Sequence, residues 1–583
     1  MLYGLVARRS ILLTLSLLTA CGAAGVGDGG KGQGALTDRA AKAASPGQAA
    51  GEVPSGLFLA ARMAGQSGDL QTATDLFLRA LAQDPTSREL REQAFLSCLL
   101  TNRPEAETLA RGQPDNAAAQ LLLAGLEAQR GHWDRAEARF AALPQQGVTQ
   151  ALQPLLVAWA QYGGGHADVA LATLRPYVAG QRFRGVYALH AAMIADLSER
   201  VGDAARLYHV AQVEYGPLNL ALARALASWQ ARQNPGPAGD AAAAHTLAAL
   251  AAASPDLQLA LPSLRRHAAD RQVRSATDGI AEVYLALAAA LRAQDASEYA
   301  ALLLHLALDL RPDLTGARLL SSEIMAASKH PDEALAVLAP IGPDDPIAPL
   351  IDERRAQLLD QLGRVPEAMQ VLARMEQALP NRAEPWRLQG TLLRGAHRYD
   401  EAVAAYDQAV RRTPDPQSDD WPLFYERGVA LERLHRWPAA EADLLHALQL
   451  QPDQANVLNY LGYSWADQGI QLTRAHEMIL RAVAQHPNDG AMLDSLGWVM
   501  FRQGDTAGAI KELEHAAELD SEDAEMNGHL GDAYRAAGRR LEAYWQWQRA
   551  LTLQPEADTV PVLRAKLKTV QAELGVPVAT ATQ

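Results

Sequence analysis

Cysteine, aromatic residues and long apolar runs are scarce in this chain of 583 residues. Its two cysteines, Cys21 and Cys98, cannot form a disulfide framework, and alone they cannot supply four ligands to a zinc ion. Aromatic residues make up only 5% of the chain, and because strands favour aromatic and β-branched residues, we expect no large β domain. Alanine and leucine, which are strong helix formers, are abundant instead. In the apolar stretch 94–100, we expect Cys98 to be a small core residue.

The chain also lacks an excess of basic residues and the usual signatures of catalytic sites. Its 53 Lys and Arg are outnumbered by 67 Asp and Glu, for a net charge of −14, whereas broad nucleic-acid binding needs a basic face. No HExxH, GxSxG or CxxC motif occurs, and the 15 histidines are scattered. Residues 25–32 nearly match a phosphate-binding loop, but no strand precedes them and a glycine follows the lysine. We therefore expect no enzymatic activity and no cofactor, metal, nucleotide or nucleic-acid site.

The first twenty residues have the pattern of an export signal. Arg8 and Arg9 precede the apolar run Ile11 to Leu18, which is shorter than the about 20 residues that span a bilayer. The run ends in Leu-Thr-Ala-Cys and resembles the bacterial lipobox, whose cysteine is lipidated and becomes the new N-terminus. The resemblance implies a lipoprotein signal peptide at residues 1–20 and a lipid anchor on Cys21. An ordinary signal peptide with a chance cysteine is the alternative.

The segment after the signal is expected to be a tether. Residues 21–56 are rich in Gly, Ala, Ser and Gln and show no apolar periodicity, which is typical of a flexible linker. In the lipoprotein family, an aspartate directly after the cysteine often retains the protein in the inner membrane. Gly22 stands at that position, which implies an outer-membrane lipoprotein that faces the periplasm.

The rest of the chain contains internal repeats. Leu496-Gly497 recurs 34 residues later as Leu530-Gly531. Each clear repeat also carries a small residue, a large residue four positions later and an alanine three positions after that, on one face of a helix. These triads are Ala402-Tyr406-Ala409, Ala440-Leu444-Ala447, Ala509-Leu513-Ala516 and Ala543-Trp547-Ala550. The pattern resembles the tetratricopeptide repeat, a 34-residue helix–turn–helix unit. The resemblance implies an all-α solenoid, a right-handed superhelix of helix pairs; a generic helical bundle with chance periodicity is the alternative.

The repeats vary in regularity along the chain. We expect degenerate repeats at residues 57–380 and regular ones at 381–555, with roughly twelve to fourteen helix pairs in all. Between residues 86 and 280 the sequence does not fix the register. Residues 556–575 are amphipathic and predict a capping helix that covers the last apolar face. Residues 576–583 are expected to be a disordered tail.

Such a solenoid has a concave surface lined by the first helix of each repeat. The register places aromatic, arginine and amide side chains there, and these types are enriched at binding hot spots. Asn456 and Asn459 can make paired hydrogen bonds to an extended peptide backbone. The alternative for Tyr463, Trp498 and Phe501 is packing against the next repeat. The candidate protein-binding groove consists of Arg387, Arg394, Tyr425, Arg433, Asn456, Asn459, Tyr463, Asp494, Trp498, Phe501, Arg502, Asp532 and Arg535.

The lipobox, the long irregular array and the sequence Asn-Tyr-Leu-Gly-Tyr at residues 459–463 together resemble tetratricopeptide lipoproteins of Gram-negative envelopes. Within that class the chain is similar to lipoprotein adaptors of periplasmic carboxyl-terminal processing proteases, which scaffold the protease and deliver cell-wall hydrolase substrates. The resemblance implies a lipid-anchored adaptor with periplasmic or envelope proteins as partners. The alternative is a structural assembly factor for an outer-membrane secretion, pilus or polysaccharide-export complex.

Overall fold

The computed structural model describes residues 54–145, 147–180, 183–215, 219–294 and 296–574. All regular structure in these ranges is helical, comprising thirty α-helices and two short 3₁₀ helices, with no strand among them. The all-α fold expected from the composition is confirmed for these residues. The signal peptide, Cys21, the phosphate-loop-like stretch and the C-terminal tail lie outside the described residues.

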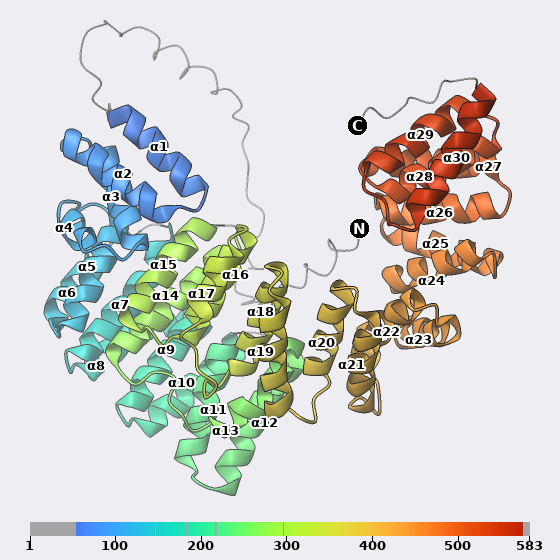
Figure 1. Ribbon diagram of the computed structural model, residues 1–583. Helices are drawn as coiled ribbons and strands as arrows, with labels where there is room; N and C mark the ends of the chain where they lie inside the picture. The colour runs from blue at the N-terminus through green and yellow to red at the C-terminus, as the bar shows by residue number, and fades with distance from the viewer. Residues whose placement is uncertain (1–53, 146, 181–182, 216–218, 295, 575–583) are drawn as a thin grey trace, which may run out of the picture. The chain divides into compact units, whose positions relative to one another are not determined.

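The described helices form two compact units that divide after Ala368, within helix α19 (Val365–Ala378). Figure 1 shows the helices following one another as adjacent antiparallel elements within each unit. The N-terminal unit contains α1 (Pro54–Gln66), α2 (Leu70–Gln83), α3 (Arg88–Leu100), α4 (Glu105–Arg111), α5 (Ala117–Gln129), α6 (Trp133–Ala141), α7 (Gly147–Gly163), α8 (Ala167–Ala179), α9 (Arg184–Leu197), α10 (Val201–Glu214), α11 (Leu220–Gln233), α12 (Pro237–Ala253), the 3₁₀ helix η1 (Pro255–Gln258), α13 (Leu261–Arg266), α14 (Ala276–Arg292), α15 (Ser297–Leu310), α16 (Thr315–Ala327), α17 (Pro331–Leu338) and α18 (Ala348–Gln361).

The C-terminal unit contains α20 (Glu384–Gly395), α21 (Tyr399–Arg411), the 3₁₀ helix η2 (Ser418–Asp420), α22 (Trp421–Arg433), α23 (Trp437–Leu450), α24 (Ala455–Gln468), α25 (Leu472–Gln485), α26 (Gly490–Arg502), α27 (Thr506–Leu519), α28 (Ala524–Ala536), α29 (Arg540–Thr552) and α30 (Thr559–Leu574). Apart from α13, α30 and the helices α18 and α19 at the division, the α-helices of the described chain make thirteen successive pairs. This number lies within the expected range.

Close packing inside each pair explains the repeat pattern. A Cβ atom on Gly497 would lie 2.5 Å from Cγ of Leu513, and one on Gly531 would lie 2.5 Å from Cδ1 of Trp547. Glycine in the first helix therefore lets the large residue of the second helix reach the backbone of its partner helix. The residues of the four triads on α21, α23, α27 and α29 are at most 3% exposed, which confirms the register that the sequence predicts for these repeats.

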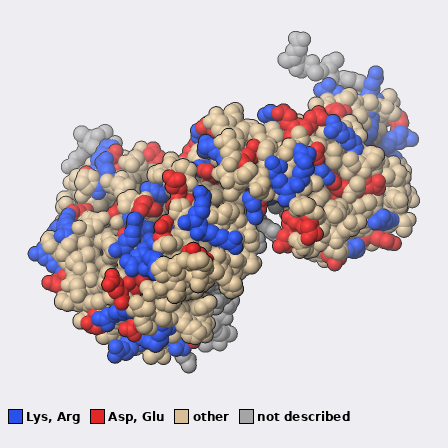
Figure 2. Space-filling model, turned by 90° about the horizontal axis from the view of Figure 1, so that it is seen from below, with Lys and Arg blue, Asp and Glu red and all other residues tan. Residues whose placement is uncertain are grey.

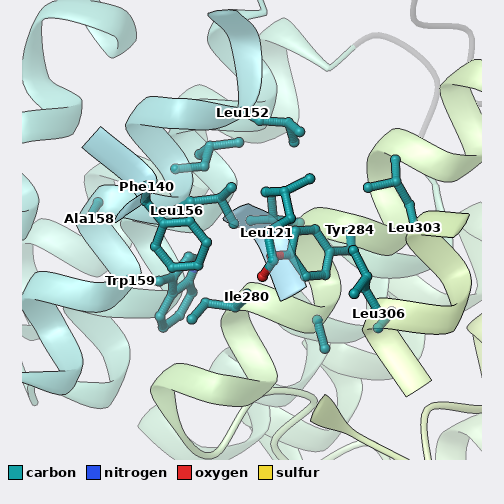
Figure 3. Close-up of a cluster of buried hydrophobic side chains, with 14 of the residues drawn as sticks. Leu121, Phe140, Leu152, Leu156, Ala158, Trp159, Ile280, Tyr284, Leu303 and Leu306 are labelled. Atoms are coloured by element: carbon teal, nitrogen blue, oxygen red, sulfur yellow. The ribbon is translucent and has the colours of Figure 1, made fainter. Parts of the chain in front are cut away.

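The inner face of the N-terminal unit is filled by helices of the same unit. Leu121 of α5, together with Leu156 and Trp159 of α7, packs in one buried cluster with Ile280 and Tyr284 of α14 (Figure 3). The Tyr284 hydroxyl donates to the carbonyl of Leu121 at 3.5 Å. These contacts join residues about 160 positions apart. Helix α14 thus packs against α5 and α7. The described side chains of these three helices fill the space between them, so this part of the unit has no open groove.

Burial also describes the end of the array and the described cysteine. Helix α30 packs on the last pair through Leu563, Leu567 and Val570, each at most 8% exposed. Cys98 has no exposed surface, and burial raises the pKa of its thiol to about 11. Cys98 is therefore an unreactive core residue, as predicted.

Candidate protein-binding groove

All thirteen predicted groove residues lie on the first helices of five successive pairs in the C-terminal unit. Helix α20 carries two of them, α22 two, α24 three, α26 four and α28 two. Arg433 is exposed, Asp494 and Trp498 are buried, and the other ten are half-buried. The predicted residues therefore lie on one series of helices, but most of them are less exposed than residues of an open surface.

Four of the predicted charged residues are held by partners within the unit. Lys566 of the capping helix donates to Asp532 at 2.7 Å, and Arg535 donates to Glu573 at 2.6 Å. At the other end of the series, Arg387 lies 3.3 Å from Glu426 of the next first helix. Arg433 reaches Glu556, in the connection between α29 and α30, at 3.2 Å. These ion pairs and hydrogen bonds join repeats within the unit. To bind another molecule, each of these side chains would have to leave its present partner.

The centre of the series is a buried polar and aromatic cluster. Nδ1 of His529 lies 2.9 Å from Oδ2 of Asp494. The Trp498 ring stacks on the His529 ring with centroids 4.1 Å apart and on Phe501 at 5.3 Å. Tyr463 donates to Glu525 from two repeats away. Trp498 therefore packs against the next repeat, which is the arrangement that the sequence left open as its alternative.

Electrostatics hold the imidazole of His529 in its charged form. Burial is the largest single effect and lowers the pKa of His529, but the carboxylates of Asp494, Glu525 and Asp532 together outweigh it and raise that pKa to about 9. A protonated ring donates from Nδ1 to Asp494. His529 and Glu525 belong to this cluster but are not among the residues predicted from the sequence. The available signal was the 35-residue spacing of Asp494 and His529, one residue more than the repeat length.

Arg502 joins two repeats at the end of α24. Its guanidinium donates to the backbone carbonyl of Asp467 at 2.5 Å and lies 5.7 Å from the Trp498 ring. A cation beside the last turn of a helix is favoured by the helix dipole and caps a free carbonyl. Arg502 is thus a connector between repeats as well as a predicted groove residue.

Several buried polar atoms on these first helices have no hydrogen-bond partner among the described residues. They are Nε1 of Trp386, Nε of Arg394, Oδ1 of Asn459, Oδ1 of Asp494 and Nε1 of Trp498. Buried polar atoms of folded proteins are paired in the great majority of cases. Four of these five residues belong to the groove predicted from the sequence.

Two further features of the described residues concern metal binding and membrane crossing. The residues that the structure describes contain no group of three His, Cys, Asp or Glu side chains placed to hold a metal ion. None of their helices combines the length and apolarity that crossing a membrane requires. On the face seen in Figure 2, Lys and Arg are interspersed with Asp and Glu.

The chain is 32% identical over 205 residues to the TPR repeat-containing protein PA4667 of Pseudomonas aeruginosa. That match covers 35% of this chain and 34% of the relative, so the chain spans about a third of the length of the protein it matches. No family model matches the chain. The 34-residue spacing and the buried triads are the chain's own evidence for the type of repeat.

The helix pairs of the C-terminal unit have the spacing, the close glycine packing and the buried triads of tetratricopeptide (TPR) repeats.

Solved TPR structures resemble the chain only loosely. The hetero-tetramer Cut9–Hcn1 of the APC/C gives a TM-score of 0.38 at 13% identity and covers 89% of this chain and 96% of that one. A tetratricopeptide repeat protein of Parabacteroides merdae gives 0.35 at 14% identity, with coverage of 44% and 97%. MamA of Desulfovibrio magneticus gives 0.26 at 20% identity, with coverage of 30% and 97%. The TPR assignment therefore stands on the geometry of the chain's own helix pairs.

Proposed function

We propose that this TPR protein is a non-enzymatic scaffold that binds an extended segment of a partner protein along the first helices of its C-terminal unit. The observation that carries the proposal is the series of unpaired, buried polar atoms on α20, α24 and α26. A bound backbone supplies both carbonyl acceptors and N–H donors, the two kinds of partner that these atoms lack. The corresponding face of the N-terminal unit is filled around α14 and is a poorer candidate.

The amides of α24 are the most adaptable groups in this groove. Asn459 is half-buried, and its Oδ1 atom has no partner among the described residues. Asn456 lies one helical turn earlier and is also half-buried. An asparagine side chain donates and accepts, so two of them on one face suit an extended peptide backbone.

The proposal extends to location and partner. The lipobox at residues 18–21 supports a lipid anchor on Cys21 in the outer membrane, with the repeats in the periplasm. The resemblance to protease adaptors supports delivery of envelope substrates to a carboxyl-terminal processing protease. A shared membrane tether would raise the effective concentration of protease and substrate without any new chemistry.

A cross-linked pull-down from envelope fractions tests the binding function. The bait is the mature full chain, compared with the double variant Asn456→Ala/Asn459→Ala and with Asn488→Ala, a matched control in an exposed loop. The partner is expected to be retained by the wild type and by the control and lost from the double variant. Equal capture by all three would place binding elsewhere on the chain.

A degradation assay tests the finer role. Cleavage of an envelope substrate by the captured protease is expected to accelerate when the purified lipoprotein is added, and the lipoprotein alone should cleave nothing. Full protease activity without it would contradict the adaptor function. Co-purification with an export channel in place of a protease would instead support the assembly-factor alternative.

A further inference from the structure

The C-terminal unit contains two apolar cores. Buried side chains of α20 to α26, at residues 393–499, form one cluster, and those of α27 to α30, at residues 509–570, form another. The side chains that pack between the two cores lie on α26, α27 and α28, namely Leu493, Met500, Phe501, Ala516 and Met526. Because few apolar side chains join the two cores, the unit bends most easily at this junction.

An ion pair connects the helices of the two cores away from this junction. Arg433, in the last turn of α22, lies 3.2 Å from Glu556, in the connection between α29 and α30. The two residues are 123 positions apart in the chain. Since Arg433 is one of the predicted groove residues, the ion pair brings the end of the fifth helix pair of the unit to the groove.

A hydrogen bond makes a second polar link past α26. Tyr463 of α24 donates to Glu525 in the first turn of α28. Arg433 and Tyr463 are both hydrogen-bond donors of the predicted groove, and both are bound to carboxylates from the helices of the other core. The groove donors are therefore occupied from within the unit while the two cores are held together.

Both links are accessible to solvent. The side chain of Arg433 is 38% exposed and that of Glu556 is 66% exposed, and Glu525 is also exposed. An exposed ion pair shifts an equilibrium by at most about fivefold and is screened by salt. Such a contact favours one arrangement of the unit and still releases it readily.

We infer that the Arg433–Glu556 ion pair is a latch that holds the C-terminal unit closed, together with the hydrogen bond from Tyr463 to Glu525. When the latch opens, the two cores bend apart at α26, and Arg433 and Tyr463 lose their internal partners. An extended partner segment then competes with Glu556 and Glu525 for these donors. This consequence for binding rests on the proposed function, whereas the latch itself does not.

Double electron–electron resonance on the full chain measures the opening without any partner. Spin labels are attached at two exposed positions, Ala439→Cys on α23 and Ala565→Cys on α30, in a chain that also carries Cys21→Ser. Cys98 has no exposed surface and stays unlabelled. Raising the salt concentration from about 0.1 M to about 1 M shortens the screening length from about 10 Å to about 3 Å. The population of longer distances between the labels should then rise roughly two- to fivefold.

Variants in the connection between α29 and α30 assign the opening to the latch. Adding Glu556→Gln to the labelled chain should raise the population of longer distances at about 0.1 M salt, and added salt should then have little further effect. The matched control is Asp558→Asn, which removes an exposed carboxylate of the same connection for which no ion pair is found among the described residues. The control should behave as the labelled chain does.

Two results would overturn the latch. One is the same distance distribution for Glu556→Gln and Asp558→Asn, and the other is a distribution in the labelled chain that does not respond to salt. The salt comparison needs no variant at Glu556, so a change in folding of Glu556→Gln would not remove the test. Because no partner is present, the outcome is independent of the pull-down that tests the proposed function.

Discussion

His529 and Asp494 form a buried pair between successive first helices, with Nδ1 of the ring 2.9 Å from Oδ2 of the carboxylate. The pair lies beneath Trp498, which stacks on the imidazole. The pair links α26 directly to α28, and neither residue belongs to the second helix of a repeat. The middle of the candidate protein-binding groove therefore contains a buried polar contact between two repeats.

This pair predicts a pH dependence of stability. The folded pKa of His529 is about 9, above the ordinary value of about 6.5 for an unfolded histidine. A raised pKa contributes stability that is fully present below about pH 6.5 and is lost as the pH rises through about 9. The urea midpoint of the wild type should exceed that of His529→Gln by an amount that shrinks from pH 6.5 to pH 9.5. A constant difference across that range would mean that His529 is neutral in the folded protein.

Two glycine substitutions test the packing of α14 against α7 in the N-terminal unit. A Cβ on Gly279 of α14 would lie 2.2 Å from Cδ2 of Trp159 in α7, so Gly279→Ala should cost ~1–3 kcal/mol by overpacking. Gly202 of α10 has nothing within 4 Å of its Cβ position, and Gly202→Ala should be neutral or stabilise by up to about 1 kcal/mol. Thermal unfolding followed by circular dichroism measures both. Equal melting temperatures for the two variants would contradict the contact between α7 and α14.

The sequence predicts the parts of this fold that depend on local spacing. The triads such as Ala509-Leu513-Ala516 are predictable because their period alone places them on one helix face, and all three are fully buried. The contact between Leu121 and Tyr284 is not predictable in this way, since no local period reports which distant repeats meet. The predicted groove residues lie on the first helices of their repeats. Packing against the next repeat was an alternative only for Tyr463, Trp498 and Phe501, and the burial of the others depends on contacts that a local pattern does not report.

The lipid anchor has a direct chemical test. Cys21→Ser removes the thiol that the lipobox presents for acylation, so the variant should remain unprocessed or leave the outer membrane. Mass spectrometry of the mature wild-type N-terminus should find an acylated Cys21. An unacylated N-terminus at another residue would instead indicate an ordinary signal peptide and a protein without an anchor.

Trp498 and Asn459 should separate stability from binding. Trp498 is only 8% exposed and stacks on His529, so Trp498→Ala should lower the free energy of unfolding by ~3–5 kcal/mol. Asn459→Ala removes a buried oxygen that has no partner among the described residues. Its melting temperature should therefore stay close to that of the wild type, while partner binding weakens by ~1–3 kcal/mol.

Melting curves and equilibrium binding to the captured partner decide between the two roles. The sequence left Trp498 open as a groove residue or a packing residue; its burial favours packing, and Asn459 is the better candidate for a residue whose loss affects binding alone. Loss of binding by Asn459→Ala at unchanged stability would support a peptide path over α24. Unimpaired binding by Asn459→Ala would move the path away from α24, since no other group there presents an unpaired buried atom within the described residues.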